Sequence, residues 1–275
     1  MILQVVKAPF VQLASIHAII HKDGVVKQKP LWFDYMSGRK RRDYAAILRK
    51  VLEIWPSPPR VKQMVSDFER ALRKAAKDVV VWVTQRGCAF HWGQAVWCKI
   101  LDIGLQSAYS SDDGTYHFCQ HLLALPYLPH TSIIKVFGRL ESSATMMKLQ
   151  QLMQYVKDTW IDSAMCPPAT WSVYCQPART NDAEGWHHWL NSRAHHRGPN
   201  INLLFSLLKH EADMVAINDK MLSDRKVRKC QCYEHSSRSG KTQQVLDGVP
   251  EWHMGGNRLL NACSWLYAPK PQQQN

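Results

Sequence analysis

The chain has 275 residues, of which 45% are hydrophobic and 21% charged, and it carries a formal net charge of +13 at pH 7. This composition is typical of a folded globular protein and excludes an intrinsically disordered chain. No apolar run approaches the roughly 20 residues that span a bilayer, and the residues after Met1 do not form a secretory leader, so a soluble protein with no membrane partner is expected. The positive charge favours a polyanionic partner such as nucleic acid, although a basic protein without such a partner remains the alternative.

Eight cysteines lie at irregular spacings along a chain that is long enough to build a core without disulfides. Together with the lack of a leader, this usage predicts reduced thiols in a nuclear or cytosolic protein.

The chain begins with β-rich segments. Residues 2–6, 10–20 and 25–35 predict three antiparallel strands, and Asp23-Gly24 between apolar runs predicts a hairpin. Pro30 is expected at an edge or a bulge of the third strand, because proline lacks the N–H that a sheet ladder uses.

Alternating helices and strands follow. Apolar residues at helical spacing predict a helix from about residue 39 to residue 54, which Trp55-Pro56 ends. A strand over 61–67, a helix to about Lys77 and an apolar strand over 79–83 come next. The order β-β-β-α-β-α-β predicts a mixed sheet with helices on its faces.

The rest of the chain is predicted to be mostly helical. A turn at Gly87 leads into a helix reaching about Leu105, residues 171–174 read as a short extended piece, and helices are expected from about Thr180 and over 201–228. The predicted organisation is an α/β core interrupted by an all-helical insertion, with these parts: 1–105 as the first part of the core, 106–170 as the insertion, 171–228 as helices completing the core, and 229–275 as a loosely ordered tail.

Asp67 is the first candidate site residue, because it follows a predicted strand directly and precedes a helix. Ligands of α/β sheets bind at this end of the strands, and a carboxylate there can hold a divalent cation. The simpler interpretation is that Asp67 starts the next helix, with Glu69 favouring the positive end of that helix.

Three further positions are candidates. Cys88 and His91 form a Cys-x-x-His step, which could contribute to a zinc site but has no second pair nearby in sequence, so bracing of the sheet edge is the preferred interpretation. Glu184 lies on a predicted helix flanked by aromatic residues, where a lone glutamate is usually solvated.

Taken together, these parts resemble the Mutator-like (MULE) transposases over roughly residues 1–215. The most specific block is at 87–97. The residues that carry the resemblance are Pro9-Phe10-x-Gln12-Leu13, Pro30-Leu31-x-Phe33, Met36-Ser37, Asp67-Phe68-Glu69-x-Ala71, Gly87-Cys88-x-Phe90-His91-Trp92-x-Gln94-Ala95 and Arg179-Thr180-Asn181-x-x-Glu184-Gly185-Trp186-His187.

The resemblance implies an RNase H-like fold and DNA strand cleavage and transfer by two-metal chemistry in the nucleus. Two Asp and one Glu would bind Mg²⁺ or Mn²⁺ ions about 3.5–4 Å apart, one ion activating the nucleophile and the other stabilising the leaving oxygen. Asp67 matches the second Asp and Glu184 matches the Glu. Cys88 and His91 match the Cys-x-x-His pair of the family, and His187, three residues after Glu184, is a possible neighbour of the metal edge.

The match to the family is incomplete. The family's first Asp belongs to an Asp-Gly-Thr-Phe-like step on the first strand, whereas no Asp precedes Asp23 in this sequence. Asp113-Gly114-Thr115-Tyr116 imitates that step in the helical region, and Asp34 on the third strand is a remote substitute. The expectation is therefore an N-terminally truncated domain with little or no strand-transfer activity. The alternatives are a non-catalytic DNA-binding or assembly protein, with a possible homo-oligomer, and a remnant reading frame.

Other motifs carry less weight. Residues 37–74 hold eleven Lys or Arg against four Asp or Glu, which predicts either a phosphate-binding surface or an ordinary solvated helix face. Cys230-x-Cys232 resembles half of a zinc site, and Ser239-Gly240-Lys241-Thr242 lacks the first glycine and the preceding strand of a P-loop.

Overall fold

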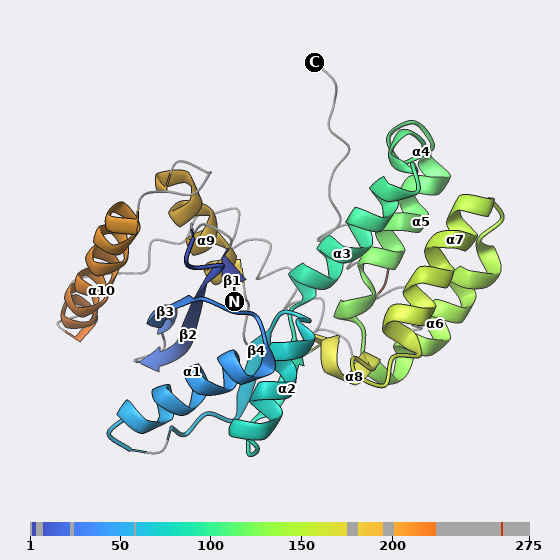
Figure 1. Ribbon diagram of the computed structural model, residues 1–275. Coiled ribbons are helices and arrows are strands. Elements are labelled where there is room, and N and C mark those ends of the chain that lie inside the picture. Colours follow the sequence, from blue (N-terminus) through green and yellow to red (C-terminus); the bar gives the residue numbers. More distant parts are fainter. Residues whose placement is uncertain are drawn as a thin grey trace. The chain divides into compact units, whose positions relative to one another are not determined.

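A computed structural model describes residues 2–3, 8–22, 25–57, 59–174, 181–194, 201–223 and 260. The protein is a mixed α/β molecule in which helices predominate, in agreement with the predicted α/β class (Figure 1). Contacts divide it into two units, Met1–Gln85 with Ala178–Cys230, and Arg86–Pro177 with Gln231–Asn275. The all-helical insertion that the sequence predicted, residues 106–170, falls within the second unit. Within the described residues, no helix is long and apolar enough to cross a lipid bilayer.

The first unit is built on an antiparallel meander. Strands β1 (Ile2–Leu3), β2 (Gln12–Lys22) and β3 (Val25–Met36) are ordered β1-β2-β3. The β2–β3 register shifts at one point, where Ile16 pairs with Trp32 but His17 pairs with Pro30. The prediction for Pro30 is therefore confirmed: it lies beside a bulge of the third strand, where the ladder is locally interrupted.

Helices α1 (Arg41–Ile54) and α2 (Arg70–Val79) pack on one face of the meander. Even-numbered residues of β2, such as Ala14 and Ile16, contact a cluster of buried side chains from β3 and these helices. Successive side chains of a strand point to opposite faces of the sheet, so alternate residues of β2 face this cluster together. The buried members of the cluster are Met36, Tyr44, Ala45, Leu48, Leu72, Ala75, Ala76 and Val80.

Helices α9 (Asn181–Arg193) and α10 (Ile201–Ser223) pack on the opposite face. Leu13 of β2 is fully buried there against Leu190, Leu204 and Leu208, and Phe33 of β3 packs against the same cluster. The meander is thus covered by helices on both faces, although about 100 residues separate α2 from α9 in sequence.

A second, two-stranded sheet pairs β4 (Gln63–Ser66) with β5 (Thr84–Gly87). The strand that ends just before Asp67 is confirmed, but the strand predicted over 79–83 is wrong. Helix α2 continues through Val79, a turn follows, and β5 begins only at Thr84. Burial explains the difference, because Val81 and Trp82 are 73% and 51% exposed, whereas Val80 packs into the α1–α2 cluster.

The second unit is helical in the residues described. The predicted extended piece at 171–174 is wrong at its start, because α8 ends on Trp171. Trp92 and Trp171 are fully buried and their rings stack at 5.2 Å, with Trp160 at 6.1 Å from Trp92. The elements are α3 (Ala89–Asp102), α4 (Gln106–Ser111), α5 (Asp113–Leu123), η1 (Leu125–Tyr127), α6 (His130–Ser143), α7 (Met147–Val156), η2 (Lys157–Ile161) and α8 (Pro168–Trp171).

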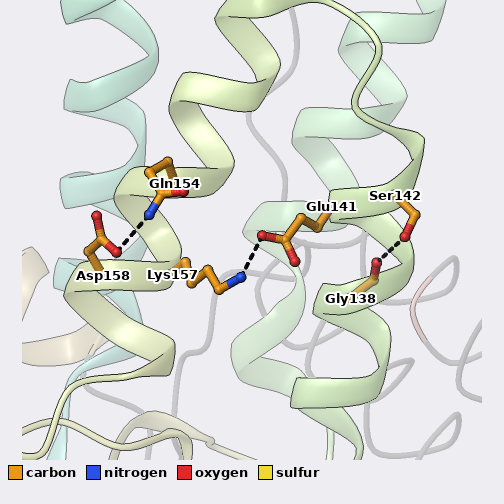
Figure 2. A network of polar contacts seen from close by, with 6 residues as sticks. All are labelled: Gly138, Glu141, Ser142, Gln154, Lys157 and Asp158. Carbon is orange, nitrogen blue, oxygen red and sulfur yellow. Dashed lines mark hydrogen bonds and ion pairs between the residues drawn. The ribbon is translucent and has the colours of Figure 1, made fainter.

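Polar contacts tie α6 to the end of α7. Figure 2 shows Lys157 donating to Glu141 at 3.0 Å, a contact that joins η2 to α6. Both side chains are more than a third exposed, so solvent screens the pair and it contributes little to stability. The apolar core therefore supplies most of the stability of this unit.

Candidate functional site

Asp67 occupies the position that the sequence predicted. It follows Ser66, the last residue of β4, and two residues lie between it and Arg70, the first residue of α2. Its side chain is half-buried, and its Oδ1 accepts a hydrogen bond from the backbone N–H of Glu69 at 3.4 Å. The carboxylate therefore lies at the strand end and at the positive end of α2 together, which suits an anionic group in either a structural or a metal-binding role.

A polar network of buried and half-buried residues lies beside Asp67. Gln12 of β2 is 1% exposed and donates through Nε2 to the hydroxyl of Tyr44 at 2.6 Å, and to the sulfur of Met36 at 2.8 Å. Tyr44 in turn donates to the carboxylate of Glu69. This chain of contacts links the meander, α1 and the turn before α2.

The network shifts the protonation of its members. Burial raises the pKa of Glu69, and the negative charge of Asp67 adds to this rise, while the hydrogen bond from Tyr44 and the charge of Arg39 oppose it. Burial also raises the pKa of Tyr44. The charge of Asp67 disfavours ionisation of Glu69, and a cation beside the Glu69 carboxylate would offset this repulsion.

Glu184 lies in α9, but its side chain is outside what the structure describes, so its separation from the Asp67 carboxylate is untested. His187, one turn further along α9, is 5% exposed and its Nε2 is 3.1 Å from the hydroxyl of Ser15 on β2. The same hydroxyl is 3.0 Å from Nε2 of His17, and burial lowers the pKa of His17 to about 4. The predicted role of His187 near a metal remains a prediction.

Cys88 and His91 belong to the second unit. Cys88 is 2% exposed and forms the N-cap position of α3, and His91 lies one turn later, edge-on to Phe90 at 5.5 Å. The four cysteines that the structure describes, Cys88, Cys98, Cys119 and Cys166, carry thiols, as predicted for them. The bracing role predicted for the Cys88–His91 pair is compatible with this position after β5 and remains a prediction.

In the described part of the chain, no three side chains of His, Cys, Asp or Glu are grouped so that they could hold one metal ion. Asp67 offers a hard oxygen donor of the kind that Mg²⁺ and Mn²⁺ prefer, and Mg²⁺ commonly keeps several waters beside one or two carboxylates. The donor type of Asp67 is therefore one that a divalent cation would accept, and the predicted role of Glu184 as a second ligand remains a prediction.

The sequence interpretation missed the Ser15–His17–His187 contacts and the Gln12–Tyr44–Glu69 chain. Period-two spacing of Leu13, Ser15 and His17 could have indicated one face of a strand, but its partners lie up to 172 residues away. The tail motifs at 230–242 fall outside the described residues, as does the tail itself apart from Leu260, so the predictions made for them stay untested.

Comparison of the sequence with protein-family models gave no match, and comparison with curated proteins gave none either.

Proposed function

We propose that this chain is a MULE-type transposase domain with an RNase H-like core, which binds DNA beside Asp67 and uses Asp67 and Glu184 as ligands for Mg²⁺ or Mn²⁺. Within this sequence the family's first Asp has no counterpart, so binding without strand cleavage is the activity expected of the chain by itself. When bound, the metal ions would supply activation of a nucleophile and stabilisation of a leaving oxygen.

The observation that carries the proposal is contact between motifs far apart in sequence. Gln12 contacts Met36, and both come from blocks that carry the resemblance. Phe33 stacks on Trp186 at 5.3 Å with an interplanar angle of 14°, which joins a block on β3 to the block containing Glu184. Residues that belong to one functional set are expected to meet in space in this way.

The charge distribution supports a DNA partner. Ten of the eleven Lys and Arg residues over 37–74 are exposed, and only Arg73 is buried. Lys40, Arg41 and Arg42 occupy the N-cap and first turn of α1, where the helix macrodipole disfavours cations. Asp78 pairs with Arg41 at 2.5 Å and Asp43 with Arg42 at 3.5 Å, and the side chain of Arg42 is 80% exposed. The phosphate oxygens of bound DNA would stabilise these positive side chains at the start of α1.

DNA binding is tested by fluorescence anisotropy with a labelled duplex at several salt concentrations. Binding should weaken steeply with salt, and the double variant Lys40→Gln/Arg42→Gln should reduce the salt slope by about 2, because each lost phosphate contact removes roughly 0.9. The matched control is Lys135→Gln/Arg139→Gln, which removes two exposed charges from α6 in the second unit. Equal slopes for the two variants, or binding that salt does not affect, would contradict the proposed DNA surface.

Metal binding is tested separately with Mn²⁺ and the full chain, by measuring free Mn²⁺ with electron paramagnetic resonance. Asp67→Asn and Glu184→Gln should each weaken Mn²⁺ binding, and Asp113→Asn, an exposed carboxylate on α5, should not. The duplex should remain intact in the presence of Mn²⁺. Equal Mn²⁺ binding by all three variants would remove Asp67 and Glu184 from the proposed site.

A further inference from the structure

Three large apolar side chains are exposed together at the start of the β4–β5 sheet. Val81 is 73% exposed, Trp82 is 51% exposed and Val61 is 47% exposed. The backbone N–H of Thr84 donates to the carbonyl of Lys62 at 3.0 Å, so the segment before β4 and the turn before β5 lie side by side. Neighbouring exposed apolar side chains with a polar rim are typical of an interaction surface.

The turn that carries Trp82 is anchored at both ends by groups other than the indole. Val80 packs into the α1–α2 cluster, and the N–H of Val83 donates to the carbonyl of Val80 at 3.0 Å. Val81 and Trp82 lie between these two anchors and are both exposed. A ring carried by a closed turn can bind a partner with little loss of backbone entropy.

Cations border these apolar side chains. Arg60 and Lys62 flank Val61 in sequence, and Lys77 lies in the last turn of α2, shortly before the turn. All three cations are exposed, and none of them forms an ion pair with another described residue. Positive charge is therefore available here for an external anionic group.

The carboxylate closest to Trp82 in sequence does not neutralise this charge. Asp78 is paired with Arg41 at 2.5 Å. The hydrogen bond from Arg41 lowers the pKa of Asp78, and the positive charges of Arg41, Arg49 and Lys74 lower it further. Asp78 is thus surrounded by cations of α1 and α2, and the surface keeps a positive excess.

We propose that this surface binds an unpaired strand of nucleic acid, with a base stacked on Trp82 and phosphates at Lys62 and Lys77. The Trp82 surface consists of Arg60, Val61, Lys62, Lys77, Val81 and Trp82. Single strands are bound by exposed aromatic rings, which any base can stack on, together with positive charge that follows the backbone. The choice of nucleic acid over another anionic partner rests on the proposed function, and the experiments separate the two.

The first experiment measures binding of a labelled oligothymidylate of about ten nucleotides to the full chain by fluorescence anisotropy. The comparison strand is an abasic strand of the same length, which keeps the phosphates and lacks the bases. Trp82→Ala should weaken binding of the oligothymidylate by about tenfold and leave binding of the abasic strand unchanged, because only bases can stack. Phe205→Ala is the matched control, since Phe205 is a 62% exposed aromatic residue on α10.

Two further sets of variants separate stacking from other contacts. Trp82→Phe should retain most of the affinity for the oligothymidylate, whereas Trp82→Leu should lose it, because leucine is apolar but has no π-system. Lys62→Gln/Lys77→Gln should weaken binding of both strands and reduce the salt slope by about 1.4, because each phosphate contact on a single strand contributes roughly 0.7.

Equal loss of affinity for the two strands in Trp82→Ala, or full affinity in Trp82→Leu, would overturn the stacking site. Trp82-dependent binding to vesicles containing phosphatidylserine, without binding of the oligothymidylate, would also overturn it by assigning the surface to an anionic membrane. Failure of the duplex-binding proposal is recognised independently, because salt-dependent binding to a blunt duplex would be absent while binding to the oligothymidylate persists.

Discussion

Leu13→Ala tests whether α9 and α10 are attached to the meander through one buried cluster. Leu13 is fully buried among Leu190, Leu204 and Leu208. The substitution removes three carbon atoms, worth about 2.4 kcal/mol at roughly 0.8 kcal/mol for each buried group. A cavity term of roughly 24 cal/mol per Å³ adds to this loss, because helices on a rigid sheet relax only in part. The expected total is about 3–4 kcal/mol.

The assay is hydrogen exchange followed by mass spectrometry, combined with urea unfolding. Two units make a single unfolding transition an unsafe assumption, whereas peptide-level exchange reports on each element by itself. Peptides from β2, α9 and α10 should lose protection in Leu13→Ala. Peptides from α5 and α6 in the second unit should keep theirs.

Leu31→Ala is the matched control, since it makes the same chemical change on the neighbouring strand at a side chain that is 38% exposed. It should cost about 1.5 kcal/mol or less, because part of the area is already in water and no enclosed cavity forms. Similar losses for the two variants, or unchanged exchange in α9 and α10, would refute the second helical layer and with it the placement of His187 against β2.

Two other predictions concern single sites. Burial and the Asp67 charge raise the folded-state pKa of Glu69 above the ordinary value of 4.5, so its contribution to stability is present below about pH 4.5 and is lost as the pH rises through the raised pKa. Glu69→Gln should therefore match the wild type at pH 4 and be more stable at pH 7 in thermal unfolding, and an equal effect at both pH values would contradict this assignment. Trp171→Phe removes an indole that is fully buried and donates to the carbonyl of Cys166 at 3.0 Å. It should destabilise the second unit by about 1–3 kcal/mol in urea unfolding, with exchange in β2 and β3 unchanged, and loss of protection in β2 instead would show that the indole supports the other unit.

Local chemistry made several features predictable from the sequence. Asp23-Gly24 between two apolar runs predicted strands that the structure has at Gln12–Lys22 and Val25–Met36, because their register follows from alternation. The missing N–H of Pro30 predicted its place at a bulge, and the end of an apolar run predicted Asp67 at a strand end. Each of these depends on residues within a few positions of one another.

Tertiary structure alone decided the features that depend on distant partners. Residues 79–83 have a strand-like composition, yet Val79 ends a helix because the α1–α2 cluster offers burial to Val79 and Val80 and none to Trp82. Ser15 and His187 meet across 172 residues, and Tyr44 links Gln12 to Glu69. Periodicity indicates which face of an element is buried, but hydrogen-bond partners and pKa shifts arise only when separate faces are brought together, and so the Trp82 surface and the network beside Asp67 emerged from the folded chain.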